Sequence, residues 1–178
     1  MRTALRVPWD VPVRLVAAAS GSPDAGRTVR TVAVGRDLPG VRAVRVTTVR
    51  VNGVEHLERI EPVAADAAVD AHGELGRLLA TLADEGGAVP VVVRGTPFTL
   101  AVLGALVRVP CGGRVTYAGL AAAAGRPRAV RAVASVMARN WVPLVLPCHR
   151  VVPSSGGAGR YGWGDEVKVA LLDAEAEQ

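Results

Sequence analysis

Two Val-rich segments in the first third of the chain constrain its fold more than any other feature. Residues 27–35 (RTVRTVAVG) and 41–51 (VRAVRVTTVRV) alternate in part between apolar and polar side chains, which is the pattern of strands with one buried face. The turn-forming residues Pro39 and Gly40 separate them. The sequence therefore predicts an antiparallel pair of strands.

The rest of the first half continues this pattern and then changes period. Residues 56–63 are a candidate third strand. Residues 66–84 carry apolar side chains at helical spacing before Gly86 and Gly87, and predict a helix. Nothing in this half points to chemistry, so we expect residues 1–90 to form a small α/β scaffold domain.

Proline and glycine punctuation predicts short helices in the second half. Thr96 can cap a helix that begins at Pro97. Thr116 can cap a second helix that Gly125 ends. The sequence thus predicts a mixed α/β (α+β) fold, with a mostly helical second domain over residues 91–178.

A third helix is expected from about Arg128 to Arg139, and with the preceding helix it makes a helix-turn-helix candidate. Arg128, Arg131, Ser135 and Arg139 recur at a spacing that places them on one side of it, among small alanines. The net charge of +5 also lies wholly in residues 91–178. Such a face suits a DNA backbone, although an arginine face that is merely solvated is an equal alternative.

The segment PLVLPCHRVVP, residues 143–153, places Cys148 beside His149 between apolar runs. A thiol needs a neighbouring base to become a thiolate at neutral pH, so the pair is a candidate nucleophile and base. A buried, inert cysteine beside a chance histidine is the alternative. Carboxylates that could orient the histidine follow downstream at Glu166, Asp173, Glu175 and Glu177.

Cysteine and histidine spacing predicts no metal site, because Cys111 and Cys148 form no CxxC pair and the three histidines are scattered. Cys111 is expected to be a loop or core residue. No run of about 18 uncharged apolar residues is present. We therefore expect a cytoplasmic protein with reduced thiols that does not enter a membrane.

Several motifs together resemble one known family. They are PCHRV at 147–151, RAV at 131–133, Asn140, the TY at 116–117, the glycine-rich SSGGAGRYG at 154–162, and Lys168 followed by paired leucines. In this order and spacing they resemble the O6-alkylguanine-DNA alkyltransferases, from about Arg94 to Glu175. Residues 1–90 match the family only in length and coarse layout.

The resemblance implies a DNA repair protein that flips O6-alkylguanine, and also O4-alkylthymine, out of double-stranded DNA. Cys148 would accept the alkyl group irreversibly in a single turnover, with no cofactor and as a monomer. His149 would act as its base through a water, oriented by Glu175. Tyr117 would donate a hydrogen bond or proton to the departing guanine, and Asn140 would brace the site.

The resemblance also implies a DNA interface and a base pocket. Arg131 would fill the gap in the base stack from the minor groove. The other expected DNA-binding residues are Arg128, Ser135, Arg139 and Thr116. The expected pocket residues are Tyr161, Gly162, Trp163, Val151 and Lys168. Without the family, Tyr117 reads as a half-buried anchor, Asn140 as a helix cap and Lys168 as a solvated lysine.

Some residues depart from the family's pattern. Trp163 and Asp165 stand where the family commonly has a small and an apolar residue, and Trp141 replaces a usual proline. Trp163 could wall the base pocket and favour small alkyl groups, and Asp165 could weaken DNA binding. A lesion sensor that flips the base without transfer is the alternative, against which Cys148 argues. A cysteine hydrolase is a third reading, which leaves the basic helices without a role.

Overall fold

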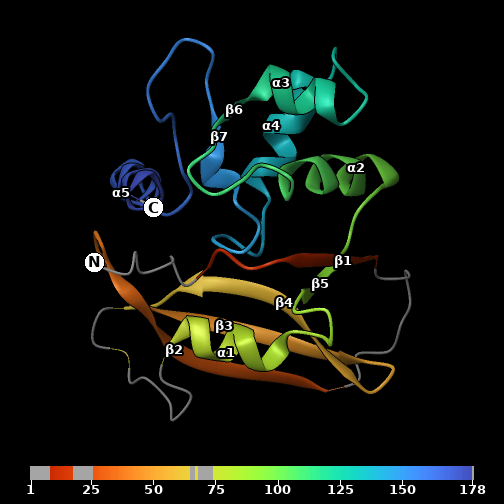
Figure 1. Ribbon diagram of the computed structural model, residues 1–178, viewed down its shortest axis with the longest axis vertical. Coiled ribbons are helices and arrows are strands. Elements are labelled where there is room, and N and C mark those ends of the chain that lie inside the picture. The colour runs from red at the N-terminus through yellow and green to blue at the C-terminus, as the bar shows by residue number, and fades with distance from the viewer. Residues whose placement is uncertain (1–8, 18–25, 65–66, 68–73, 178) are drawn as a thin grey trace.

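The computed structural model describes residues 9–17, 26–64, 67 and 74–177. Its first half is a five-stranded sheet with the strand order β1-β5-β4-β3-β2. The strands are β1 (Val13–Ala17), β2 (Arg27–Leu38), β3 (Val41–Val51), β4 (Val54–Pro62) and β5 (Val89–Val93). Figure 1 shows one helix lying on a face of this sheet and the remaining helices gathered beyond its β1 edge.

Strands β2, β3 and β4 form an antiparallel meander, so the predicted strand pair and the candidate third strand are confirmed. The β3–β4 turn contains Asn52 and Gly53, whose φ angles are 51° and 81°. A two-residue turn with both φ angles positive is the type I′ turn, which matches the twist of a hairpin and favours Asn-Gly. This local signal fixes the register next to the turn, from Val51 opposite Val54 to Thr48 opposite Leu57, beyond which an irregularity shifts it.

Strands β1 and β5 were not predicted. They pair in parallel, from Val13 opposite Val89 to Ala17 opposite Val93. The helix α1 (Leu75–Leu82) buries four leucines at helical spacing. It is shorter than the helix expected over residues 66–84, whose residues 66 and 68–73 lie outside the described part.

The first two helices of the second half begin where the sequence predicts. In α2 (Pro97–Leu106) the Thr96 side chain accepts a hydrogen bond of 3.2 Å from the Thr99 amide. In α3 (Tyr117–Ala123) the Thr116 side chain accepts one of 3.0 Å from the Gly119 amide. Gly125 follows α3 with a φ of 72°, the left-handed conformation that ends helices.

The predicted arginine-bearing helix is shorter than expected. The helix α4 spans Val130–Ala138, so Arg128 precedes it and Arg139 is its C-cap. The reason is a turn after α3, closed by the Ala129 amide donating to the Arg126 carbonyl at 2.9 Å. Of the four residues expected on one helix face, Arg131 and Ser135 lie within the helix. The helix-turn-helix assignment of α3 and α4 stays a prediction.

The remaining elements surround the cysteine. They are β6 (Val115–Thr116), the 3-10 helix η1 (Cys148–Arg150), β7 (Val151–Val152) and α5 (Asp165–Ala176). The parallel pairing of β6 with β7 joins the start of α3 to the chain just after η1. Tyr117 and Cys148, far apart in sequence, are thereby brought to one region.

One apolar core connects the two halves, running from sheet residues such as Leu57 to helix residues such as Leu106 and Leu171. The Ile60 amide in β4 also donates to the Trp141 carbonyl at 2.8 Å. The division after residue 90 would cut β5, so a boundary that keeps the sheet whole lies after Val93. The two-domain organisation itself stays a prediction. Among the described residues, no helix is long and apolar enough to cross a membrane.

Candidate active site

Cys148 lies at the start of η1, where Asn140 holds the preceding loop. The Asn140 Nδ2 atom donates to the Leu146 carbonyl at 2.9 Å and to the Cys148 Sγ atom at 3.0 Å. Its Oδ1 atom accepts from the Val142 amide at 3.0 Å. Because all three bonds come from one amide, Asn140 fixes the loop and the sulfur together. It does follow the C-cap of α4, but its side chain serves the cysteine loop.

Glu175 is the centre of a buried polar network behind the cysteine. Its Oε1 atom lies 2.8 Å from His149 Nε2, and both side chains are fully buried. The Arg150 guanidinium donates to both Glu175 oxygens at 2.9 and 2.8 Å. The Gly112 amide and the Trp9 indole also donate to Glu175, each at 3.3 Å. Of the four carboxylate candidates, the fold selects Glu175.

This network fixes the protonation states of its members. Burial acts to raise the pKa of Glu175, but hydrogen bonds from His149 and Arg150 overcome it and lower the pKa to about 2. Burial lowers the pKa of His149 despite the carboxylate beside it. At neutral pH Glu175 is therefore ionised and His149 neutral. His149 Nε2 then carries the proton shared with Glu175, which leaves Nδ1 as the basic nitrogen.

The opposite nitrogen of the histidine is available for proton transfer. His149 Nδ1 is buried and makes no hydrogen bond to the described residues. Its lone pair is free to accept a proton, directly or through a bridging water. The chain has thus placed a neutral, oriented base next in sequence to the thiol.

Cys148 itself is a resting thiol. Burial raises its pKa, against the opposing effects of the Asn140 hydrogen bond and the Lys168 charge. The Tyr161 hydroxyl also acts to lower the thiol pKa, although it makes no hydrogen bond of standard geometry. The environment therefore stabilises the thiolate only in part, and at neutral pH the sulfur is protonated.

A cavity of about 420 Å³ opens onto the Cys148 sulfur. It is lined by Tyr117, at the start of α3 and before Cys148 in sequence, and by Trp163, in the loop that follows Cys148 and precedes α5. The Tyr161 and Trp163 rings meet edge to face, with centroids 6.3 Å apart. Asp165 supports this loop by accepting from the Tyr161 amide at 2.9 Å. The other lining residues are Ala134, Met137, Ala138, Asn140, Pro143, Arg160 and Gly162.

Two expected pocket residues do not line this cavity. Val151 is fully buried in the core. Lys168 is buried behind η1, where its Nζ atom donates to the Val151 carbonyl at 2.7 Å. The solvated alternative for Lys168 is therefore wrong. Its ammonium supports the segment after the cysteine and acts on the Cys148 pKa from behind.

The expected DNA-binding residues are placed as follows. Arg131, Ser135 and Arg139 are exposed on α4 and its C-cap, and Arg128 is exposed on the turn before it. Thr116 is half-buried, with its hydroxyl engaged in capping α3.

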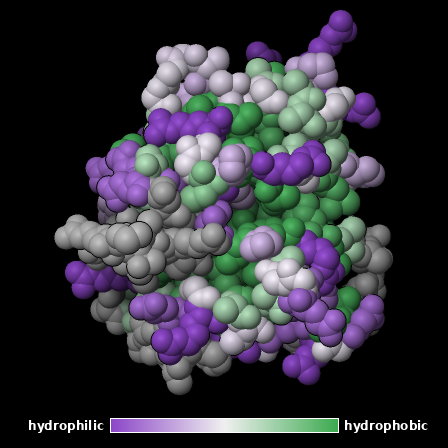
Figure 2. Space-filling view, viewed as in Figure 1, coloured by the Kyte–Doolittle hydropathy of each residue, from purple (hydrophilic) through white to green (hydrophobic). Residues whose placement is uncertain are grey.

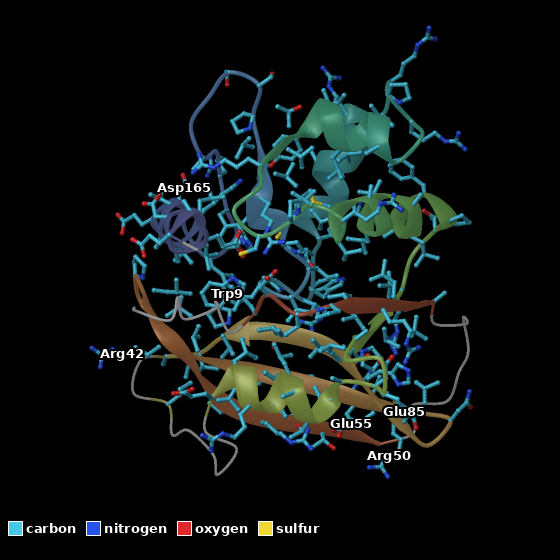
Figure 3. The ribbon with its side chains drawn as sticks, viewed as in Figure 1. Trp9, Arg42, Arg50, Glu55, Glu85 and Asp165 are labelled. Atoms are coloured by element: carbon cyan, nitrogen blue, oxygen red, sulfur yellow. The ribbon has the colours of Figure 1, made fainter. Side chains whose placement is uncertain are left out.

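Sequence reasoning missed the other groups that bond Glu175 directly, which are Arg150, Trp9 and the Gly112 amide. Arg150 bonds Asp10 at 3.2 Å and the Val109 carbonyl at 2.7 Å besides Glu175. Trp9 is almost fully buried and lies between the sheet and α5 (Figure 3). The signal for Arg150 was its place directly after His149, and the signal for Trp9 was the scarcity of aromatic residues.

Known proteins match this arrangement. Residues 97–177 match the family model of the 6-O-methylguanine DNA methyltransferase, DNA binding domain. The match covers the second half of the chain, from the start of α2 through α5. The family resemblance carried by the cysteine motif, the Asn140 position and the glycine-rich loop is thereby confirmed.

Relatives of the family extend the match. The bifunctional transcriptional activator/DNA repair enzyme Ada of Escherichia coli is 40% identical over 128 residues, 70% of this chain and 36% of that protein. The human methylated-DNA--protein-cysteine methyltransferase is 49% identical over 82 residues, 46% of this chain and 40% of that protein. The chain thus spans less than half the length of both these curated relatives.

The fold likeness includes the sheet. The structure of Mycobacterium tuberculosis OGT in complex with DNA matches with a TM-score of 0.58 and 26% identity, over 82% of this chain and 92% of that one. The mixed α/β fold predicted from the sequence is confirmed at this level. The likeness reaches the first half, where sequence motifs gave no family signal.

Proposed function

We propose that the protein repairs alkylated DNA by moving the alkyl group of O6-alkylguanine, and of O4-alkylthymine, onto Cys148 in a single turnover. The observation that carries this proposal is the Cys148 sulfur at a cavity, bonded by Asn140 and followed by the neutral His149 paired with Glu175. Relatives named as methylated-DNA--protein-cysteine methyltransferases support it.

The transfer balances without a cofactor. The thiol proton passes to His149 Nδ1 through a water, and the new imidazolium is stabilised by the ionised Glu175. The Cys148 sulfur attacks the alkyl carbon, forming the S–C bond as the bond from that carbon to O6 breaks. The Tyr117 hydroxyl, which lines the cavity, protonates or hydrogen-bonds the departing guanine. Since a thioether is not hydrolysed, each molecule acts once.

The base has to leave the duplex to reach this cavity, because a stacked base cannot present its O6 substituent to the sulfur. We place α4 in the minor groove, with Arg131 filling the stack. Arg131 is exposed, and the neighbouring Ala132 and Ser135 are also exposed and small. Small side chains let the DNA backbone approach the helix closely. Arg128 and Arg139 would contact phosphates from the two ends of α4.

Intact-mass measurement tests the function. The protein is incubated with a duplex that carries one O6-methylguanine, and the modified peptide is mapped. We expect a gain of one methyl per molecule on the peptide with Cys148, and none in Cys148→Ala. Selective binding to the lesion without a mass gain would instead support the sensor alternative. If the protein shows no binding to the lesion and no transfer, both the transfer function and the sensor alternative are refuted.

A further inference from the structure

A second cavity, of about 430 Å³, lies on the other side of α4 from Cys148. We call it the seam groove, because its walls come from β5, α2, α4 and the segment after α4. The α4 residues that line it are Ala132, Ser135 and Val136, whereas Ala134, Met137 and Ala138 line the Cys148 cavity. The helix proposed to enter the minor groove is thus a partition between two cavities of similar size.

The seam groove has an apolar floor and a cationic rim. Phe98, Leu103 and Val142 contribute to the floor, and Figure 2 shows apolar surface gathered between the helical half and the sheet. Arg94 and Arg139 line the rim, and none of the lining residues is acidic. Arg94 is 52% exposed and pairs with Glu58 at 3.0 Å. This combination suits a partner that carries both negative charge and flat apolar surface.

Trp141 supplies such a flat surface at the groove. Its side chain is 56% exposed, and among the large hydrophobic residues exposed in the described part it alone is aromatic. The Arg59 guanidinium lies over its ring, 4.3 Å from the centroid. The hydrogen bond from the Ile60 amide to the Trp141 carbonyl holds this position. An aromatic ring held in place beside arginines is the usual composition of a nucleic-acid stacking surface.

We propose that the seam groove is a second DNA contact, which holds the strand on the side of α4 opposite the extruded base. Arg94 and Arg139 contact its phosphates, and Trp141 packs against a sugar or base. The proposal rests on the proposed function for its partner and adds a surface to which the sheet contributes through Arg59. Two separate cavities flanking one inserted helix match the two strands that flank a minor groove.

Binding measurements with matched variants test this contact. Trp141→Ala and Arg94→Gln are compared with Arg42→Ala, which removes an exposed arginine of β3 (Figure 3). Affinity for a duplex with one O6-methylguanine is measured by fluorescence anisotropy over a salt series. We expect Trp141→Ala to weaken binding roughly tenfold. Arg94→Gln should lower the slope of log K against log salt by about one, with Arg42→Ala unchanged.

Tryptophan fluorescence gives a direct readout, because Trp9 is buried and Trp163 half-buried. Iodide should quench the emission of Trp141, which is the part of the signal that Trp141→Ala lacks. Duplex DNA should protect this emission from iodide. Wild-type affinity and salt slope in both groove variants, with melting temperatures unchanged, would overturn the proposal. So would variants that alter self-association in sedimentation and leave DNA binding intact.

The outcome is separable from that of the proposed function. If the wild type gains no methyl but binds DNA through the groove, only the transfer function fails. If the wild type gains the methyl and the groove variants bind DNA normally, only the groove fails.

Discussion

At the scale of single residues, Cys148 combines a specific hydrogen-bond donor with a burial that disfavours its charged form. The Asn140 bond to the sulfur and the Lys168 charge lower the thiol pKa, but burial outweighs them. A reactive cysteine is commonly activated in its resting state. Here Asn140 fixes the position of the sulfur, while burial keeps the thiol protonated.

The reactivity of the free protein should reflect this balance. Without DNA, alkylation of Cys148 by iodoacetamide should be slow at pH 7 and should still be rising at pH 9, because burial raises the thiol pKa. Asn140→Ala should slow it about tenfold further at fixed pH, since one hydrogen bond to a charged group is worth about 1.5 kcal/mol or more. Peptide mapping separates Cys148 from Cys111. A rate that levels off below pH 8 would contradict this prediction.

Trp163 should set the size of the alkyl group that the cavity accepts. Its side chain lines the cavity and packs edge to face on Tyr161. Trp163→Gly should raise transfer from O6-benzylguanine relative to O6-methylguanine, because it removes a wall and not the nucleophile. Single-turnover rates with both substrates measure the ratio, and equal ratios in wild type and variant would exclude the wall. Trp141→Gly is the control: Trp141 lines the other cavity as a proposed DNA contact, so its loss should lower both rates together and leave their ratio unchanged.

At the scale of elements, α3 begins at a threonine cap and carries Tyr117 to the cavity. The Thr116 bond to the Gly119 amide satisfies one of the otherwise unpaired amides of the first turn. The parallel pairing of Thr116 with Val152 attaches the same residue to the segment after the cysteine. One residue therefore fixes both where α3 starts and how far it lies from Cys148.

Thr116→Ala should lower the free energy of unfolding by about 1 kcal/mol, the usual cost of losing a threonine cap. Thr116→Ser keeps the hydroxyl and should lose less. Urea unfolding measures both, and transfer rates show whether Tyr117 has moved. Equal stabilities of the alanine and serine variants would mean that the cap contributes nothing.

Local signals account for the elements that the sequence predicted, and distant pairings account for those it did not. Thr96 and Thr116 mark helix starts because capping depends on a few adjacent residues. Residues 13–17 and 89–93 are strands because they pair with each other across the chain, and Pro90 argues against an interior strand. The Asn52-Gly53 turn was a local signal that could have been used.

The candidate site divides in the same way. Cys148, His149 and Asn140 lie close together in sequence, and the family motif assigned them before any geometry was known. Spacing alone left four carboxylates open, the family resemblance named Glu175, and the fold places its carboxylate 2.8 Å from His149 Nε2. Lys168 and Val151 were expected in the pocket but lie behind it, because sequence position does not tell which side of a buried segment a residue faces.

At the scale of the whole molecule, the Glu175 network joins both ends of the chain. It links Trp9 and Asp10, before the first strand, to His149 and Arg150 in the cysteine segment. The segment that leads into the sheet therefore contacts the cysteine segment and α5 through side-chain hydrogen bonds, in addition to the apolar core that the two halves share. We expect the acid stability of the protein and the reactivity of Cys148 to depend on this network.

Acid should unfold the protein through Glu175. Its pKa is about 2 in the folded state, against 4.5 for an unperturbed glutamate of the unfolded chain. The carboxylate thus contributes stability that is complete above pH 4.5 and is lost as pH falls towards 2. At about 1.4 kcal/mol per pKa unit the contribution is roughly 3 kcal/mol. Glu175→Gln should flatten the stability curve over this range in urea unfolding, whereas Glu166→Gln, exposed on the same helix, should follow the wild type.

Trp9 should tune the base from the other end of the chain. Its indole donates to the same Glu175 oxygen that accepts from His149, at 3.3 Å. Removing this donor leaves more negative charge on that oxygen, which should raise the pKa of His149. Trp9→Phe keeps an aromatic ring but loses the donor, so it should shift the pH profile of methyl transfer upwards. Trp9→Ala should in addition lower stability by about 3 kcal/mol or more through the cavity it leaves. Transfer rates between pH 5 and 9 give the profile, and chemical unfolding gives the stability. A Trp9→Phe profile that coincides with the wild type would make Trp9 a packing residue alone.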